Sequence, residues 1–195
     1  LKQGIAIAGT HGKTTTTSGA AGFYQWYRDT PEVNQSMPFT LPFRQGEDGV
    51  WTYDNQQFFP LGQRDTLMLS GEVGYTIADS RNGIPQEYVF RTGGTGSVRG
   101  YSYQSLGVSE GSAIVGGRYM ANATVEYTHW LDDTWGIAAF VDAGNAVDDL
   151  SKVDLAYGYG LGARWRTVAG PIAVDLAYGE QSEAVHLHFS LAIPF

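Results

Sequence analysis

From Arg64 to the end of the chain, apolar and polar residues alternate with a period of two, which is the pattern of β-strands. The last segment is typical: every odd position from Val185 to Phe195 is apolar, whereas the even positions hold two histidines, Ser, Ala and Pro. Each strong segment is about ten residues long, the length of a transmembrane β-strand. The alternation predicts strands at 67–77, 119–131, 135–143, 157–166, 172–179 and 185–195, with a weaker seventh at 88–91.

The two faces of these strands differ in a way that favours a membrane barrel. One face is aromatic and aliphatic, whereas the other carries small residues, glycines and a few charges. The polar face of a soluble β-sandwich meets water and is usually rich in Lys and Glu, so a sandwich is the less favoured alternative. The charged positions of the polar face are Glu72, Arg91, Arg118, Glu126, Asp142, Arg164, Arg166 and Asp175.

The connections between the predicted strands also differ in length. They are short at 132–134 and 168–170, modest at 78–85, and long at 93–112 and 145–156. Outer-membrane barrels have short periplasmic turns and longer external loops, so we expect the three shorter connections on one side. Seven strands do not close such a barrel, and 50–59 is a candidate for one more. The prediction is an all-β fold: the C-terminal portion, about seven or eight strands, of a larger antiparallel transmembrane β-barrel.

Composition narrows the function classes. The 195 residues carry a net charge of −8, and charged residues make up 16%, against about 25% in typical soluble proteins. The acidic balance argues against nucleic acid as a partner, because phosphates need clustered Lys and Arg. The chain has no cysteine, which excludes disulfides, thiolate metal sites and thiol catalysis. No apolar run approaches the roughly 20 residues of a membrane-spanning helix.

A glycine-rich motif at 93–101, Gly-Gly-Thr-Gly-Ser-Val-Arg-Gly-Tyr, resembles a loop of the outer-membrane assembly-factor superfamily that contains BamA and TamA. The family tetrad Val/Ile-Arg-Gly-Phe/Tyr matches Val98, Arg99, Gly100 and Tyr101. A second family block matches 140–144 (Phe-Val-Asp-Ala-Gly), 158–160 (Gly-Tyr-Gly) and 169–171 (Ala-Gly-Pro). The aromatic-rich last strand, with Phe189 and the terminal Phe195, is similar to the insertion signal of such barrels. The resemblance covers about residues 62–195, and its details look closest to the TamA branch.

The resemblance implies a protein of the Gram-negative outer membrane that catalyses no covalent chemistry and needs no cofactor. Its implied function is to help β-barrel or autotransporter proteins insert, using a weak barrel seam and a locally perturbed membrane. The implied partners are outer-membrane lipid, client outer-membrane proteins and, as one candidate, a periplasm-spanning subunit. A passive outer-membrane pore or a purely structural barrel is the main alternative.

Two acids of the inner face indicate where the glycine-rich loop docks. If Leu131 pairs with Trp135 across the short turn, Glu126 lies opposite Phe140, and Asp142 is its diagonal neighbour. Two carboxylates this close repel each other unless a cation lies between them. Arg99 can offer a planar fork to both, and the resemblance implies the same docking of the loop inside the barrel.

The other polar residues of the inner face are expected to be structural. His186 and His188 suggest a metal site or a pH switch, but without a third ligand nearby we interpret them as wall residues and predict no metal site. Arg164 and Arg166 are expected to form inner-wall ion pairs with Asp175.

The N-terminal region differs from the rest. Residues 4–18 resemble the ATP-binding loop of Mur ligases, in which Gly9, Gly12, Lys13 and Thr14 would serve phosphate and Mg²⁺. No βαβ series follows, as such a loop requires, so we interpret 1–19 as a fused or rearranged segment and an ATP-dependent ligase fragment as a second alternative. Residues 20–61 are irregular, apart from the candidate strand, and 62–195 form the predicted barrel portion.

Overall fold

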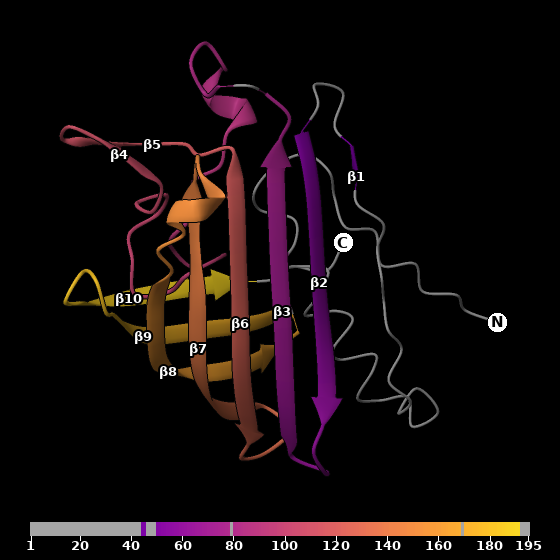
Figure 1. Ribbon diagram of the computed structural model, residues 1–195. Coiled ribbons are helices and arrows are strands. Elements are labelled where there is room, and N and C mark those ends of the chain that lie inside the picture. Colours follow the sequence, from indigo (N-terminus) through magenta and orange to yellow (C-terminus); the bar gives the residue numbers. More distant parts are fainter. Residues whose placement is uncertain (1–43, 46–49, 79, 169, 192–195) are drawn as a thin grey trace.

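The computed structural model describes residues 44–45, 50–78, 80–168 and 170–191, and its main element is one antiparallel sheet (Figure 1). Its strands lie in the order β1-β2-β3-β6-β7-β8-β9-β10. Consecutive strands of the chain pair with each other, except that β3 pairs with β6, because β4 and β5 form a separate hairpin. The strands are β1 (Arg44–Gln45), β2 (Val50–Pro60), β3 (Asp65–Thr76), β4 (Val108–Glu110), β5 (Ala113–Val115), β6 (Tyr119–Trp130), β7 (Trp135–Val147), β8 (Ala156–Thr167), β9 (Gly170–Gly179) and β10 (Ala184–Leu191).

The only helices in the described ranges are two single-turn 3₁₀ segments, η2 (Gln86–Tyr88) and η3 (Leu150–Lys152). Neither they nor any other described segment forms a helix of the length and hydropathy that a membrane crossing requires.

The sheet curls strongly along its width. In Figure 1, β2, β3, β6 and β7 stand upright, whereas β8, β9 and β10 run across them. The register between β6 and β7 is the one expected from the short turn: Glu126 lies opposite Phe140, and Leu131 donates its N–H to the carbonyl of Trp135. The all-β antiparallel fold predicted from the sequence is therefore confirmed, and the candidate strand at 50–59 is present as β2.

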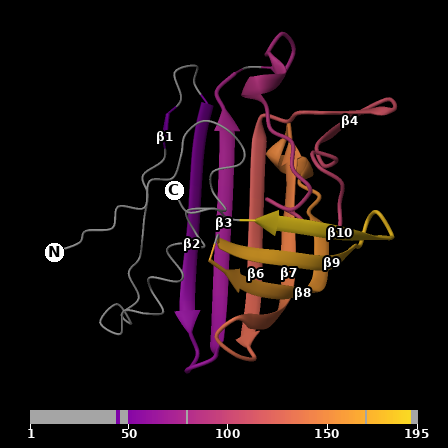
Figure 2. The same cartoon turned by 180° about the vertical axis from the view of Figure 1, so that it is seen from behind.

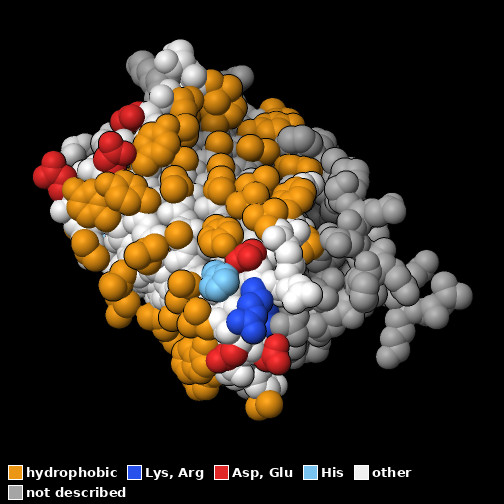
Figure 3. All heavy atoms as spheres, turned by 90° about the horizontal axis from the view of Figure 1, so that it is seen from below, with side chains coloured by type: hydrophobic (Ala, Val, Ile, Leu, Met, Phe, Trp, Pro, Cys, Tyr) orange, Lys and Arg blue, Asp and Glu red, His pale blue; other side chains and the backbone are white. Residues whose placement is uncertain are grey.

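The outer and inner faces of the sheet differ as the alternation predicts. Along β7, the side chains of Trp135 and Val141 are 46% and 51% exposed, whereas those of Phe140 and Asp142 are 3% and 0% exposed. On the face seen in Figure 3, hydrophobic side chains form wide patches over the described residues, and the charged ones gather in small groups. A soluble sandwich would bury this apolar face, whereas a membrane barrel presents it to lipid.

The prediction of a weak seventh strand at 88–91 is wrong. This segment makes one isolated bridge, between Phe90 and Gly117, and follows the short helix η2. It is too short for a span, and the Phe90 ring packs against Gly74 of β3, close enough that a Cβ there would lie 2.8 Å away. The residues between β3 and β6 therefore form a single long connection.

This correction also moves the connection at 78–85, which is of modest length and was expected on the same side as the short turns. It lies on the side of the long loops, where Arg81 forms ion pairs with Asp148 of the β7–β8 connection and with Glu110, at 2.6 Å each. The short turns of the opposite side are 61–64, 131–134 and the connection between β8 and β9.

Candidate functional site

The glycine-rich part of the β3–β6 connection folds onto the concave side of the sheet, which Figure 2 shows from behind. Thr92 anchors its start: the hydroxyl donates to the Asn122 side chain (2.7 Å), whose amide donates to Glu72 of β3 (3.0 Å). Further along, Gly100 adopts a φ of +92°, and a Cβ at this position would lie 2.6 Å from the backbone nitrogen of Gly179. Only glycine fits this close approach of loop and wall.

Arg99 is the centre of the site. Its guanidinium forms a two-pronged contact with Asp142 of β7, from Nε to Oδ2 at 2.7 Å and from Nη2 to Oδ1 at 2.9 Å. The backbone N–H of Arg99 also donates to Asp142 Oδ2, at 3.0 Å. The guanidinium carbon lies 3.3 Å from the centre of the Phe140 ring, in cation–π geometry. This matches the planar recognition that arginine, but not lysine, can provide.

Two further carboxylates and a second arginine complete a network around Arg99. Arg99 Nη1 lies 2.8 Å from Glu126 Oε2 and 3.1 Å from Asp175 Oδ2. Arg164 of β8 binds the same two acids, at 2.8 Å to Glu126 and 2.5 Å to Asp175. Three carboxylates thus share two guanidinium groups, and each of the three lies within 3.1 Å of a guanidinium nitrogen, which offsets their mutual repulsion.

The acids around Arg99 outweigh the effect of its burial. Burial by itself would lower the pKa of the Arg99 guanidinium, but the hydrogen bonds and charges of Asp142 and Glu126 raise that pKa above its ordinary value. Because a buried ion pair that loses one partner leaves an uncompensated charge, the docked loop depends on all members of the network.

Val98 and Tyr101, on either side of the Arg99–Gly100 pair, pack the loop against the wall. Val98 is fully buried, in a small apolar cluster with Tyr101, Leu106 and Ala156. The Tyr101 hydroxyl donates to the carbonyl of Tyr157 and accepts from the N–H of Gln181, both at 3.0 Å. All four residues of the tetrad therefore contact the inner wall or its loops.

The sequence analysis brought Arg99, Glu126 and Asp142 together, but it did not assign Asp175 or His188 to loop docking. Asp175 was expected to pair with both arginines of β8; it binds Arg164, whereas the Arg166 guanidinium lies over the Trp130 ring at 3.3 Å. His188 accepts the N–H of Gly100. The signal for Asp175 was the run of inner-face glycines in β8, since a strand without side chains lets the acids of β7 and β9 reach the same guanidinium group.

The remaining predicted site residues lie apart from this network. Phe189 points outward from β10 and is exposed. Phe195 lies outside the described residues, as do Gly9, Gly12, Lys13 and Thr14 of the segment that resembles a phosphate loop. Within the described ranges, no cluster of three or more His, Cys, Asp or Glu residues could hold a metal ion.

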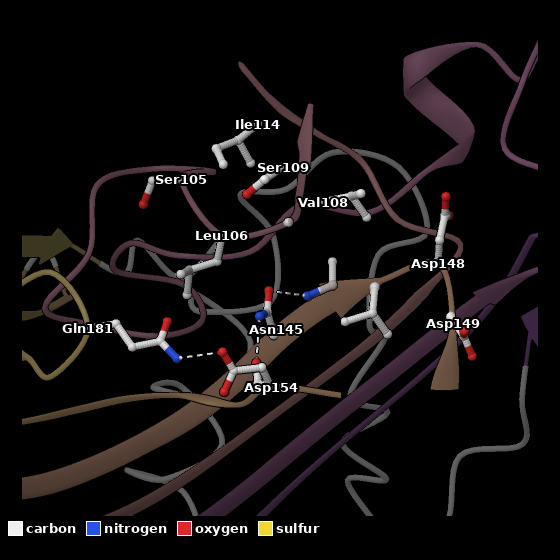
Figure 4. A pocket seen from close by; sticks show the side chains of 13 residues that line it. Ser105, Leu106, Val108, Ser109, Ile114, Asn145, Asp148, Asp149, Asp154 and Gln181 are labelled. Atoms are coloured by element: carbon white, nitrogen blue, oxygen red, sulfur yellow. Dashed lines mark hydrogen bonds between the residues drawn. The ribbon is translucent and has the colours of Figure 1, made fainter. Parts of the chain in front are cut away.

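A cavity of about 500 Å³ lies on the long-loop side, between the hairpin β4–β5 and the β7–β8 connection (Figure 4). Its polar residues bind one another: Asn145 donates to the Asp154 carbonyl at 2.6 Å, and Gln181 donates to the Asp154 carboxylate at 3.3 Å. The tetrad side chains do not line it, but Leu106, which packs with Val98 and Tyr101, does.

Comparison with known proteins gives a consistent result. The model of the Omp85 superfamily domain matches residues 15–195. The outer membrane protein assembly factor BamA of Neisseria meningitidis serogroup B is 37% identical over 108 residues, which are 50% of this chain and 14% of that protein. The chain thus spans only a small part of that relative.

Among solved structures, the crystal structure of BamA from Haemophilus ducreyi lacking POTRA domains 1–3 is similar, with a TM-score of 0.59. The match covers 72% of this chain and 33% of that one, and at 18% identity it shows a shared fold. Because the family model covers nearly the whole sequence and the fold agrees, the chain belongs to the Omp85 superfamily of Gram-negative outer-membrane proteins.

Proposed function

We propose that this chain is the C-terminal barrel portion of an outer-membrane assembly factor that promotes the insertion of β-barrel or autotransporter proteins. It acts without covalent chemistry and without a cofactor. The observation that carries the proposal is the Arg99 loop, bound through three acids to the inner wall of a sheet with an apolar outer face. The relative from Neisseria meningitidis, an outer membrane protein assembly factor by name, supports this assignment.

The proposed role of the docked loop is to hold the concave side of the sheet in one arrangement while clients engage the membrane nearby. A loop that merely blocked a pore would only need to fill space. This loop is instead bound to the wall by directional hydrogen bonds at Thr92, Arg99 and Tyr101. The partners of the complete protein are client outer-membrane proteins, outer-membrane lipid and a periplasm-spanning subunit.

Within the superfamily, we place the chain nearest to the TamA branch. This placement is supported by the amino-acid sequences of two segments, 99–106 (Arg-Gly-Tyr-Ser-Tyr-Gln-Ser-Leu) and 140–149 (Phe-Val-Asp-Ala-Gly-Asn-Ala-Val-Asp-Asp). Loss of autotransporter secretion, with normal levels of other barrel proteins, after deletion of the gene is the expected phenotype. A general loss of barrel proteins would instead place it with BamA.

The test of the function is Arg99→Ala in the complete protein. We expect client insertion into the outer membrane to fall several-fold while the protein's own barrel still folds, because the ladders between strands do not involve Arg99. Arg99→Lys should restore activity only in part, because lysine keeps the charge but loses the fork. Arg91→Ala, in the same connection, is the matched control and should behave like the wild type.

The two alternatives give different results. A passive pore would show a changed single-channel conductance in Arg99→Ala with no change in client insertion. A ligase-like role of residues 1–19 would appear as ATP binding that Lys13→Ala abolishes.

A further inference from the structure

His188 lies on the inner face of β10, which is at one end of the described sheet and pairs there with β9. Its side chain is only 7% exposed, and both ring nitrogens contact the docked loop. Gly100 donates its backbone N–H to Nε2 at 2.9 Å, and the Thr95 hydroxyl lies 3.1 Å from Nδ1.

These contacts determine the state of the imidazole. A backbone N–H can only donate, so Nε2 must be unprotonated to accept from Gly100. The ring is then neutral with its proton on Nδ1, from where it donates to the Thr95 hydroxyl. The pair of hydrogen bonds therefore requires one tautomer.

The same stretch of loop is held from two directions. Arg99 is bound to Asp142 of β7, whereas the adjoining Gly100 is bound to β10 and to the turn before it, since Ser182 donates to the Gly100 carbonyl at 3.1 Å. Neighbouring loop residues thus link strands that are three positions apart in the sheet. Within the described sheet, β7 and β10 are not hydrogen-bonded to each other directly.

We propose that His188 is a positioning residue through which the docked loop holds β10, so that loop docking and the placement of this end strand are coupled. By linkage, weakening either contact loosens the other. The consequence for client insertion rests on the proposed function, but the coupling itself does not.

Trypsin provides a direct readout, because the Arg99–Gly100 bond is cleaved only when the loop leaves the wall. In the complete protein reconstituted in lipid, we expect His188→Ala to accelerate cleavage at Arg99 about tenfold, the effect of losing the two hydrogen bonds on the population of the open loop. His188→Gln keeps an acceptor for Gly100 and should restore most of the protection. His186→Ala, on the same strand and face, is the control and should match the wild type.

Two further measurements complete the test. In His188→Ala, hydrogen exchange of the β10 amides should accelerate, whereas that of β6 should not. In the wild type, the ¹⁵N shifts of His188 should show an unprotonated Nε2, a readout that needs no variant. Unchanged cleavage in His188→Ala, unchanged exchange in β10, or a protonated Nε2 would each overturn the proposal. Faster cleavage with normal client insertion would instead uphold the coupling and count against the function proposed for the loop.

Discussion

At the scale of single residues, the acids that receive Arg99 are not equivalent. Asp142 is fully buried and accepts three hydrogen bonds from Arg99, two from the guanidinium and one from the backbone. Glu126 accepts one from Arg99 and is also held by Arg164. Loop docking should therefore depend more on Asp142 than on Glu126.

We predict that Asp142→Ala destabilises the docked loop by about 3–5 kcal/mol, because it removes the main partner of a buried charge. Glu126→Ala should cost about 1.5–3 kcal/mol, since Asp175 still faces both arginines. The rate of tryptic cleavage at Arg99, compared with the wild type, measures both values. A larger effect of Glu126→Ala would show that the fork on Asp142 is not the main anchor.

At the scale of elements, β8 is the strand that makes room for the site. Its inner-face glycines face groups from other elements: Gly158 faces the Arg99 carbonyl, Gly160 the Phe140 ring and Gly162 the Asp175 carboxylate. A Cβ at any of these three positions would overlap the facing group. The glycines weaken the strand by itself, but they let the loop approach the wall.

Gly158→Ala should displace the loop without harming the strand, because alanine is favoured over glycine by about 0.5–1 kcal/mol inside a strand. We expect faster cleavage at Arg99 with an unchanged thermal midpoint of the barrel. Gly71→Ala in β3, where no atom lies within 4 Å of the added methyl group, is the control. If the loop of Gly158→Ala stayed protected from trypsin, the wall would have to shift to make room for the added methyl group, which would contradict the prediction.

Neighbouring positions of β10 test which face meets lipid. Leu187 is 69% exposed on the outer face, and His186 lies on the inner face. Leu187→Arg should cost about 2–4 kcal/mol of folding free energy in a bilayer if it lies near the midplane. His186→Arg should cost much less, because the inner face admits polar groups. Equal costs in a bilayer unfolding titration would contradict the assignment of the faces.

At the scale of the whole molecule, the curved sheet is a wall with an apolar outside and a polar inside. The aromatic pair Trp135 and Trp165 lies on the outside near the short turns, with ring centres 5.1 Å apart. Trp130 of β6 is buried on the inner face, where the Arg166 guanidinium lies over its ring. Tryptophan at a strand end is typical of the aromatic girdles of membrane barrels.

Variants that retain a single tryptophan can therefore report the orientation of the wall. Brominated phospholipids should quench the fluorescence of Trp135 or Trp165 strongly and that of Trp130 weakly. The reason is that bromine on lipid chains reaches only the outer face. Quenching of Trp130 equal to that of Trp165 would contradict the described arrangement.

Much of this organisation follows from local patterns. The period-two alternation determines the strands and their faces, and a short turn determines the register that places Asp142 diagonal to Glu126. These features depend on residues close in the sequence or on adjacent strands, which is why they could be predicted. The segment at 88–91 shows the limit: Tyr88 and Phe90 alternate as in a strand, but the Phe90 ring packs against Gly74 instead.

The tertiary structure alone decided what meets across the concave side. Whether Asp175 and His188 reach a loop from between β3 and β6 depends on how far the sheet curls over β8, β9 and β10. That curl arises from twist and side-chain volume summed over many strands, so no local pattern specifies it. The sequence by itself therefore determined the wall and the arginine that binds it, whereas only the folded sheet determined that the same loop also contacts His188 of β10.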